Sequence, residues 1–450
     1  MEITDLSITE LAAALRDKRV SAVEATRACL DKIHKTRELN NFISLCEERA
    51  MTDAVRADAM IARGELSSLC GVPLAIKDNI CVSGVRCTCG SRLFEEYVPE
   101  ADATVVRRLE KAGAVIIGKT NMDELAMGST DESSAFGAVK NALDISRVPG
   151  GSSGGSANCV AARQAFGALG TDTGGSIRQP AAYCGTVGLK PTFGVVPTDG
   201  LIGFCRSLDT VGVFARDCDG ALTLFGAAAG RNDIEPLDGD VRGKTIGIAD
   251  EFMRADTDDG VRLEFESAVK RLSEAGANIV RVAVNSFCAT LSAYHILSSA
   301  EASESILRFA GDDKSKLAML GAEVRRRIVT GATVKSGDNF DDLYVRAAKV
   351  RAVIKREYES ALERCDALIS PATSSVATLL GEGSDPIKTH KGDYFLAGVS
   401  LAGLPAASVP CGYSVGLPVG MQIIGGRNGE REILNIGKAV MRGNSAPRIA

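Results

Sequence analysis

Short, entirely apolar segments alternate with helical patterns along most of this chain, and this alternation limits the folds that it can adopt. Residues 114–118 are apolar throughout and of strand length, and they follow a segment in which Val105, Val106 and Leu109 recur with helical spacing. A short run that is apolar at every position is typical of a strand buried on both faces, which helices must cover. The pattern therefore predicts an α/β protein.

The same reasoning places elements over the rest of the chain. Ser7 and Ser21, each followed three residues later by a glutamate, form capping boxes that predict two short N-terminal helices. No Pro- and Ser-rich linker interrupts the pattern, so we expect one domain over residues 1–450, with an N-terminal helical part (1–65) and a mainly helical insertion (290–363). Strands are also predicted at 42–45, 72–77, 245–249, 279–284, 367–369, 406–409 and 420–424, and helices at 47–63, 157–166, 261–272 and 430–441.

Composition argues against several classes of protein. The net charge of −5 offers no basic surface for nucleic acid or for an anionic membrane. The acidic first residues and the lack of any run of 18 apolar residues favour a cytoplasmic protein without a signal peptide. The 13 cysteines include no C-x-x-C pair and the 3 histidines are widely spaced, so we expect free thiols and no metal site.

The 47 glycines exceed average usage, about 7% of residues, and they concentrate in the runs 150–156 (Gly-Gly-Ser-Ser-Gly-Gly-Ser) and 172–178 (Asp-Thr-Gly-Gly-Ser-Ile-Arg). A flexible linker is the common explanation for a Gly/Ser run. Here, however, the first run precedes an apolar helical pattern at 157–166, which favours an ordered turn at a helix N-terminus. A phosphate-binding P-loop is disfavoured because no lysine follows the glycines.

A serine nucleophile needs a base and backbone N–H donors for the oxyanion, and histidine is scarce here. Lys77, at the end of an apolar strand, can serve as the base if burial lowers its pKa from about 10.4 towards 7–8. Ser176 follows two glycines, so an incoming carbonyl meets no bulky side chain. Ser152 can bridge the lysine and the nucleophile. The N–H groups of Thr173, Gly174 and Gly175 can converge on one oxygen.

At these residues the chain resembles the amidase signature hydrolases. The matching segments, 71–79, 118–124, 149–156, 172–180 and 188–192, occur in one order, and with 401–405 and the N-terminal helices the resemblance covers nearly the whole chain. It implies a large mixed central sheet covered on both faces by helices, with a catalytic core at 66–225. It also implies a Ser–cis-Ser–Lys triad, which falls on Ser176, Ser152 in a cis peptide, and Lys77.

Within that family the chain is most similar to the branch that releases ammonia from glutamine. In that branch an arginine and an aspartate bind the ends of the zwitterion, and by motif position these are Arg327 in 324–328 and Asp393, just before 400–405. The run beginning at Met127 resembles the segment that lines the pocket, which makes Gly128 and Ser129 expected glutamine contacts. The chain departs from the branch at 198–200 and 337–342.

The resemblance also implies partners. The ammonia would pass to a B subunit that uses ATP and Mg²⁺ to amidate misacylated Glu-tRNA(Gln) or Asp-tRNA(Asn), while a small C subunit holds a heterotrimer together. No cofactor is expected in this chain itself. A stand-alone amidase acting on an acyl, aryl or peptide amide is the main alternative, and a scaffold subunit with a degenerate site is disfavoured because Lys77, Ser152 and Ser176 are all present.

Overall fold

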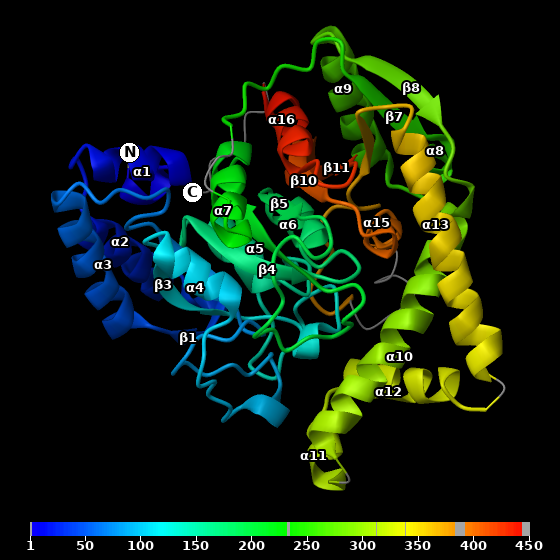
Figure 1. Cartoon of the computed structure of the whole chain (residues 1–450), viewed down its shortest axis with the longest axis horizontal. Helices are drawn as coiled ribbons and strands as arrows, with labels where there is room; N and C mark the ends of the chain where they lie inside the picture. The colour runs from blue at the N-terminus through cyan, green and yellow to red at the C-terminus, as the bar shows by residue number, and fades with distance from the viewer. Residues whose placement is uncertain (1, 232–234, 312, 338, 383–391, 443–450) are drawn as a thin grey trace.

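The computed structural model describes residues 2–231, 235–311, 313–337, 339–382 and 392–442. Within these residues, 11 strands form a mixed sheet in the order β1-β3-β2-β4-β6-β5-β10-β11-β9-β7-β8 (Figure 1). This confirms the α/β architecture. The strands are β1 (Phe42–Leu45), β2 (Pro73–Lys77), β3 (Val115–Thr120), β4 (Gly167–Asp172), β5 (Val187–Lys190), β6 (Thr210–Ala215), β7 (Thr245–Ala249), β8 (Asn278–Val282), β9 (Ala367–Pro371), β10 (Ala406–Ser414) and β11 (Leu417–Gly425).

Helices lie on both faces of this sheet, as expected. Along β11, a Cβ added at Gly420 would meet Ala182 of α6, whereas one added at Gly425 would meet Ile433 of α16. Since side chains alternate between the faces of a strand, α6 and α16 cover opposite faces. The α-helices are α1 (Ile8–Arg16), α2 (Ala22–Lys35), α3 (Glu47–Ala62), α4 (Thr104–Lys111), α5 (Gly154–Ala161), α6 (Arg178–Cys184), α7 (Cys218–Ala229), α8 (Asp250–Arg254), α9 (Asp259–Glu274), α10 (Thr290–Ala310), α11 (Lys314–Ala318), α12 (Ala322–Val334), α13 (Arg346–Leu362), α15 (Ala397–Ala402) and α16 (Glu430–Met441).

Both predicted capping boxes are present: the side chains of Ser7 and Ser21 accept hydrogen bonds from the N–H groups of Glu10 and Glu24, at the starts of α1 and α2. Within the described residues, none of the helices is both long and apolar enough to span a membrane.

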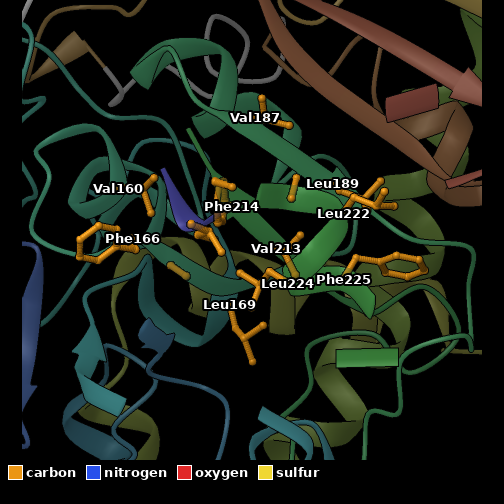
Figure 2. Packing of buried hydrophobic residues seen from close by; sticks show 14 of the residues in the cluster. Val160, Phe166, Leu169, Val187, Leu189, Val213, Phe214, Leu222, Leu224 and Phe225 are labelled. Atoms are coloured by element: carbon orange, nitrogen blue, oxygen red, sulfur yellow. The ribbon is translucent and has the colours of Figure 1, made fainter. Parts of the chain in front are cut away.

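The centre of the sheet packs into a continuous apolar core. Among the core side chains that Figure 2 labels are Leu169 of β4, Leu189 of β5 and Phe214 of β6, together with Val160 of α5 and Phe225 of α7. All five side chains are buried. This packing fixes β2 and β4, which are adjacent and parallel, so their last residues lie at the same edge of the sheet. The candidate site forms at that edge.

The glycine-rich run 150–156 is buried and ordered, as its context predicted, but the helix that follows differs from the expected 157–166. It begins inside the run at Gly154 and ends at Ala161. Arg163 then adopts a φ of +59°, and the N–H of Phe166 donates to the carbonyl of Pro73. The apolar pattern continues past the helix because the chain turns back beside β2 and must stay buried as it enters β4.

The insertion expected at 290–363 is mainly helical. Helices α10, α12 and α13 pack together beside the sheet, with α11 at the tip of this part (Figure 1). Its α12 contributes residues to the pocket described below.

Candidate active site

Lys77 ends β2 with a fully buried side chain. Its Nζ lies 2.8 Å from Ser152 Oγ, 2.8 Å from Ser153 Oγ and 3.0 Å from Thr171 Oγ1. The structure thus brings Lys77 and Ser152 together, as the sequence predicted. Ser153 and Thr171 are two further contacts that the sequence analysis did not identify.

The hydrogen-bond partners of the two serine hydroxyls at Lys77 indicate which serine can exchange a proton with it. The Ser153 hydroxyl also donates to the carbonyl of Thr171, at 3.1 Å, so Ser153 can only accept from the lysine. Ser152 Oγ makes no hydrogen bond besides that to Lys77 in the described part of the chain. A neutral amine keeps two N–H groups and one lone pair. Of the two serine protons at Lys77, that of Ser152 is therefore the one free to move towards Lys77 or towards a neighbouring group.

Burial lowers the pKa of Lys77 to about 8, although the carboxylates of Asp131 and Asp123 act in the opposite direction. Both carboxylates are themselves buried and are held by backbone N–H groups: Asp131 accepts from Gly155 at 2.8 Å, and Asp123 accepts from Asp131 at 3.0 Å. A substantial fraction of Lys77 is consequently neutral near pH 8, as a base requires.

The peptide bond between Gly151 and Ser152 is cis. Gly151 lies against Asp123, since a Cβ added there would be 2.1 Å from Asp123 Oδ2. Only glycine fits at this position without displacing the carboxylate.

Ser176 lies in the loop that joins β4 to α6, and this loop leaves its N–H groups free. Within the described residues, Thr173, Gly174, Gly175 and Ser176 donate no backbone hydrogen bond, whereas the next N–H, of Ile177, donates to Asp172 Oδ2 at 3.2 Å. Four consecutive unpaired N–H groups beside a serine hydroxyl can stabilise an oxyanion. Three of these N–H groups belong to Thr173, Gly174 and Gly175, the donors expected from the sequence, and the fourth belongs to Ser176 itself.

Two close approaches explain the glycines before Ser176. A Cβ on Gly174 would lie 2.4 Å from Cζ of Tyr294, and Gly175 has a φ of +150° and packs against Leu396. A side chain at either position would displace the loop or close the pocket above it.

A cavity of about 520 Å³ opens above Ser176. It brings together Ser176 and all four predicted glutamine contacts: Gly128, Ser129, Arg327 and Asp393. A larger depression of about 750 Å³, between α1, α4 and α7, contains none of these residues. The other residues lining the cavity are Asp123, Glu124, Ala126, Met127, Thr130, Glu132, Ser133, Gly174, Phe204, Tyr294, Gly321, Ala322, Glu323, Arg326 and Gly381.

Opposite charges face this cavity. Arg327 is buried on α12 with its guanidinium 5.7 Å from the centre of the Phe204 ring. Asp393 precedes α15, and a Cβ on Gly175 would be 3.3 Å from its Oδ1, so its carboxylate lies against the Ser176 loop. Burial raises the pKa of Asp393 to about 7, against the effect of Arg327. A zwitterion is the ligand that this pair suits.

Tyr294 and Phe204 also line the cavity and were not singled out from the sequence. Tyr294 comes from α10 and Phe204 from the loop between β5 and β6. Neither lies in a recognisable motif, so only tertiary contacts identify them. Within the described ranges, no group of three His, Cys, Asp or Glu side chains is arranged to hold a metal ion.

Comparison with known proteins identifies the family of this chain. The profile of the family described as Amidase matches residues 24–434, and the chain therefore belongs to the amidase family. It is 42% identical to the A subunit of the glutamyl-tRNA(Gln) amidotransferase of Caldanaerobacter subterraneus subsp. tengcongensis, over 98% of this chain and 96% of that protein.

Solved structures show the same fold. The A subunit of the glutamyl-tRNA(Gln) amidotransferase of Thermotoga maritima superposes with a TM-score of 0.83 at 34% identity, covering 100% of this chain and 97% of that one. The peptide amidase of Stenotrophomonas maltophilia superposes with a TM-score of 0.82 at 29% identity, covering 99% of each chain. The family thus includes relatives that match either of the two functions considered from the sequence.

Proposed function

We propose that this chain is a glutaminase, the subunit of a tRNA amidotransferase that releases ammonia from glutamine. The observation that carries the proposal is the shared cavity of Ser176, Arg327 and Asp393. Arg327 would bind the α-carboxylate of glutamine and Asp393 its ammonium group, leaving the side-chain amide to reach the serine. A pocket for a neutral acyl or aryl amide would not need two buried opposite charges, whose desolvation is costly.

The chemistry follows from the contacts around Lys77. Ser176 attacks the amide carbonyl while its proton passes through Ser152 to neutral Lys77. The N–H groups of Thr173, Gly174, Gly175 and Ser176 stabilise the oxyanion, and a single donor of this kind contributes about 3 kcal/mol in related enzymes. The proton returns through Ser152 to the leaving nitrogen, the C–N bond breaks, and ammonia departs, which leaves Ser176 as a γ-glutamyl ester. Water then hydrolyses the ester and frees Ser176.

The names of its relatives support a multisubunit role for the chain. Proteins 40–42% identical over nearly the whole chain carry the name of the A subunit of glutamyl-tRNA(Gln) amidotransferase. In the proposed assembly a B subunit uses ATP and Mg²⁺ to amidate the misacylated tRNA, and a C subunit joins the two in a cytoplasmic heterotrimer. The net charge of −5 suits a chain that leaves most tRNA contacts to its partners.

The test is ammonia release from glutamine by the purified chain, alone and with the B and C subunits from the same source. We expect glutamine hydrolysis that rises with the partners present and disappears in Ser176→Ala, which should remain folded. Faster turnover of an uncharged amide than of glutamine, unaffected by partners, would instead identify a stand-alone amidase.

A further inference from the structure

We propose that Glu323 is a positioning residue that holds the guanidinium of Arg327 in the orientation that accepts a substrate carboxylate, and so sets the preference of the pocket for a zwitterionic amide. This inference rests on the proposed glutaminase function. Glu323 lies one turn before Arg327 on α12, and both line the cavity above Ser176.

The contacts of Arg327 leave one edge of its guanidinium available. Its Nε donates to Glu323 Oε1 at 2.7 Å, and its Nη1 donates to Ser298 Oγ at 3.3 Å. Arginine has five N–H donors, so three remain without a partner among the described residues, including both on Nη2. A carboxylate can accept from Nη1 and Nη2 together, which is the two-point geometry that arginine favours.

The ring of Phe204 restricts the same guanidinium from its face, at 5.7 Å between Cζ and the ring centre. The Arg327 side chain is only 5% exposed, so it has little freedom to leave this position. Glu323, Ser298 and Phe204 together fix the plane of the guanidinium. Of these three, only Glu323 also carries a compensating charge.

Glu323 is itself held firmly. Its two carboxylate oxygens each accept a 2.6 Å hydrogen bond from Arg326, through Nε and Nη2. Gly321, the N-cap of α12, is anchored to the core, because its N–H donates a hydrogen bond to the buried Glu124 carboxylate at 2.7 Å. An acidic residue in the first turn of a helix is also favoured by the helix dipole. The carboxylate that orients Arg327 is therefore fixed before any ligand binds.

Pairing with Glu323 also keeps Arg327 away from the other carboxylate in the cavity. Among the described residues, Arg327 forms its ion pair with Glu323 at 2.7 Å and none with Asp393. If Arg327 paired with Asp393, the two groups that should bind opposite ends of glutamine would neutralise one another. Glu323 thus leaves Asp393 available for an ammonium group.

The decisive variant is Glu323→Gln, because glutamine is nearly isosteric but has one acceptor oxygen for two arginines and no charge. The experiment measures kcat and KM for glutamine and for butyramide, an uncharged amide. We expect KM for glutamine to rise about tenfold or more, with kcat and the kinetics of butyramide little changed. Glu323→Asp, which keeps the charge, should recover part of the loss.

Glu304→Gln is the matched control. Glu304 also bonds an arginine four residues away, Arg308, and it bonds Lys335 beyond the end of α12, but it lies outside the cavity. The Glu304→Gln variant should therefore leave kcat and KM unchanged for both glutamine and butyramide. A thermal melt of each variant checks folding; if Glu323→Gln does not fold, the comparison is made with Glu323→Asp, which should still raise KM for glutamine selectively.

Two failures are distinguishable. If the wild-type protein prefers butyramide to glutamine, the proposed function fails and this inference fails with it. If the wild type prefers glutamine but the Glu323 variants alter both substrates equally, or neither, then only the role of Glu323 is rejected.

Discussion

Arg178 and Asp172 form a fully buried, two-point ion pair that closes the loop carrying Ser176. Arg178 Nη2 lies 2.8 Å from Asp172 Oδ1, and its Nε lies 3.0 Å from Oδ2. Arg178 also donates to the carbonyl of Leu396 at 2.9 Å and to Ser400 Oγ at 2.8 Å, on either side of the start of α15. One side chain therefore ties the Ser176 loop to the segment that positions Asp393.

Arg178→Lys should impair both stability and catalysis, since lysine cannot make the two-point contact and leaves Asp172 under-paired. Breaking a buried pair costs about 3–5 kcal/mol in other proteins, and a comparable loss in the free energy of unfolding is expected by urea titration. We expect kcat to fall at least about tenfold, since the oxyanion donors lie in the same loop. Arg308→Lys, in an exposed pair with Glu304, is the control and should cost under about 1 kcal/mol. Unchanged kcat in Arg178→Lys would contradict the positioning of the loop by this pair.

Ser152→Ala and Ser153→Ala should differ sharply although both serines lie 2.8 Å from Lys77. Ser152 holds the only serine proton at Lys77 that is not already donated to the backbone, so its removal should lower kcat by about 10²–10⁴, the usual contribution of acid–base catalysis. Ser153→Ala removes only a contact to Lys77, so it should lower kcat by a smaller factor. Equal losses in single-turnover assays would argue against proton transfer through Ser152.

The pH dependence of kcat/KM for butyramide should follow Lys77, because kcat/KM reports the groups of the unliganded enzyme and butyramide has no ammonium group for Asp393 to bind. The lowered pKa of Lys77, about 8, means that the lysine is mostly protonated below pH 8 and mostly neutral above it. Since the base must be neutral, kcat/KM for butyramide should rise with pH, about tenfold per unit below the pKa, and level off above it. Lys77→Met should abolish activity while leaving the protein folded, because an apolar side chain of similar length suits the buried position. A rate that is independent of pH from about 6 to 9 would exclude this base.

The pH dependence of KM for glutamine should follow Asp393 instead. Its pKa is raised to about 7, so the carboxylate is protonated, and no longer attracts an ammonium group, as the pH falls through 7. KM for glutamine should therefore rise below pH 7, whereas KM for butyramide should not. Asp393→Asn should give a high KM that does not vary with pH. The same low-pH rise for both amides would place the titrating group outside the substrate pocket.

Much of the fold and of the candidate site could be predicted from local sequence. The capping boxes at Ser7 and Ser21 and the apolar strands are local patterns, and the structure places them within a few residues of the prediction. The Gly/Ser runs also carry a local requirement, because Gly151 and Gly174 lie where a Cβ would strike Asp123 or Tyr294. Such close approaches require glycine, so they can be recognised in the sequence even when the contacting residue is distant along the chain.

The end of α5 and several residues of the candidate site could not be predicted, because they depend on contacts between segments far apart in the chain. The helix expected to reach Phe166 ends at Ala161, since pairing with β2, rather than helical periodicity, determines where the chain turns. Thr171, Phe204 and Tyr294 have no motif of their own. They reach the site only because the sheet, a loop and α10 converge there.

The chemistry available to this protein follows from its sequence alone: a lysine at the end of an apolar strand, serines among glycines, and hardly any histidine. The protonation state of the base, the donors for the oxyanion and the orientation of the charged groups depend instead on the tertiary structure. The lowered pKa of Lys77, the free N–H groups before Ser176 and the pairing of Arg327 with Glu323 all arise from burial and from distances between side chains. Burial and distance are properties of the packed chain, because desolvation and hydrogen bonding depend on which distant segments surround each group.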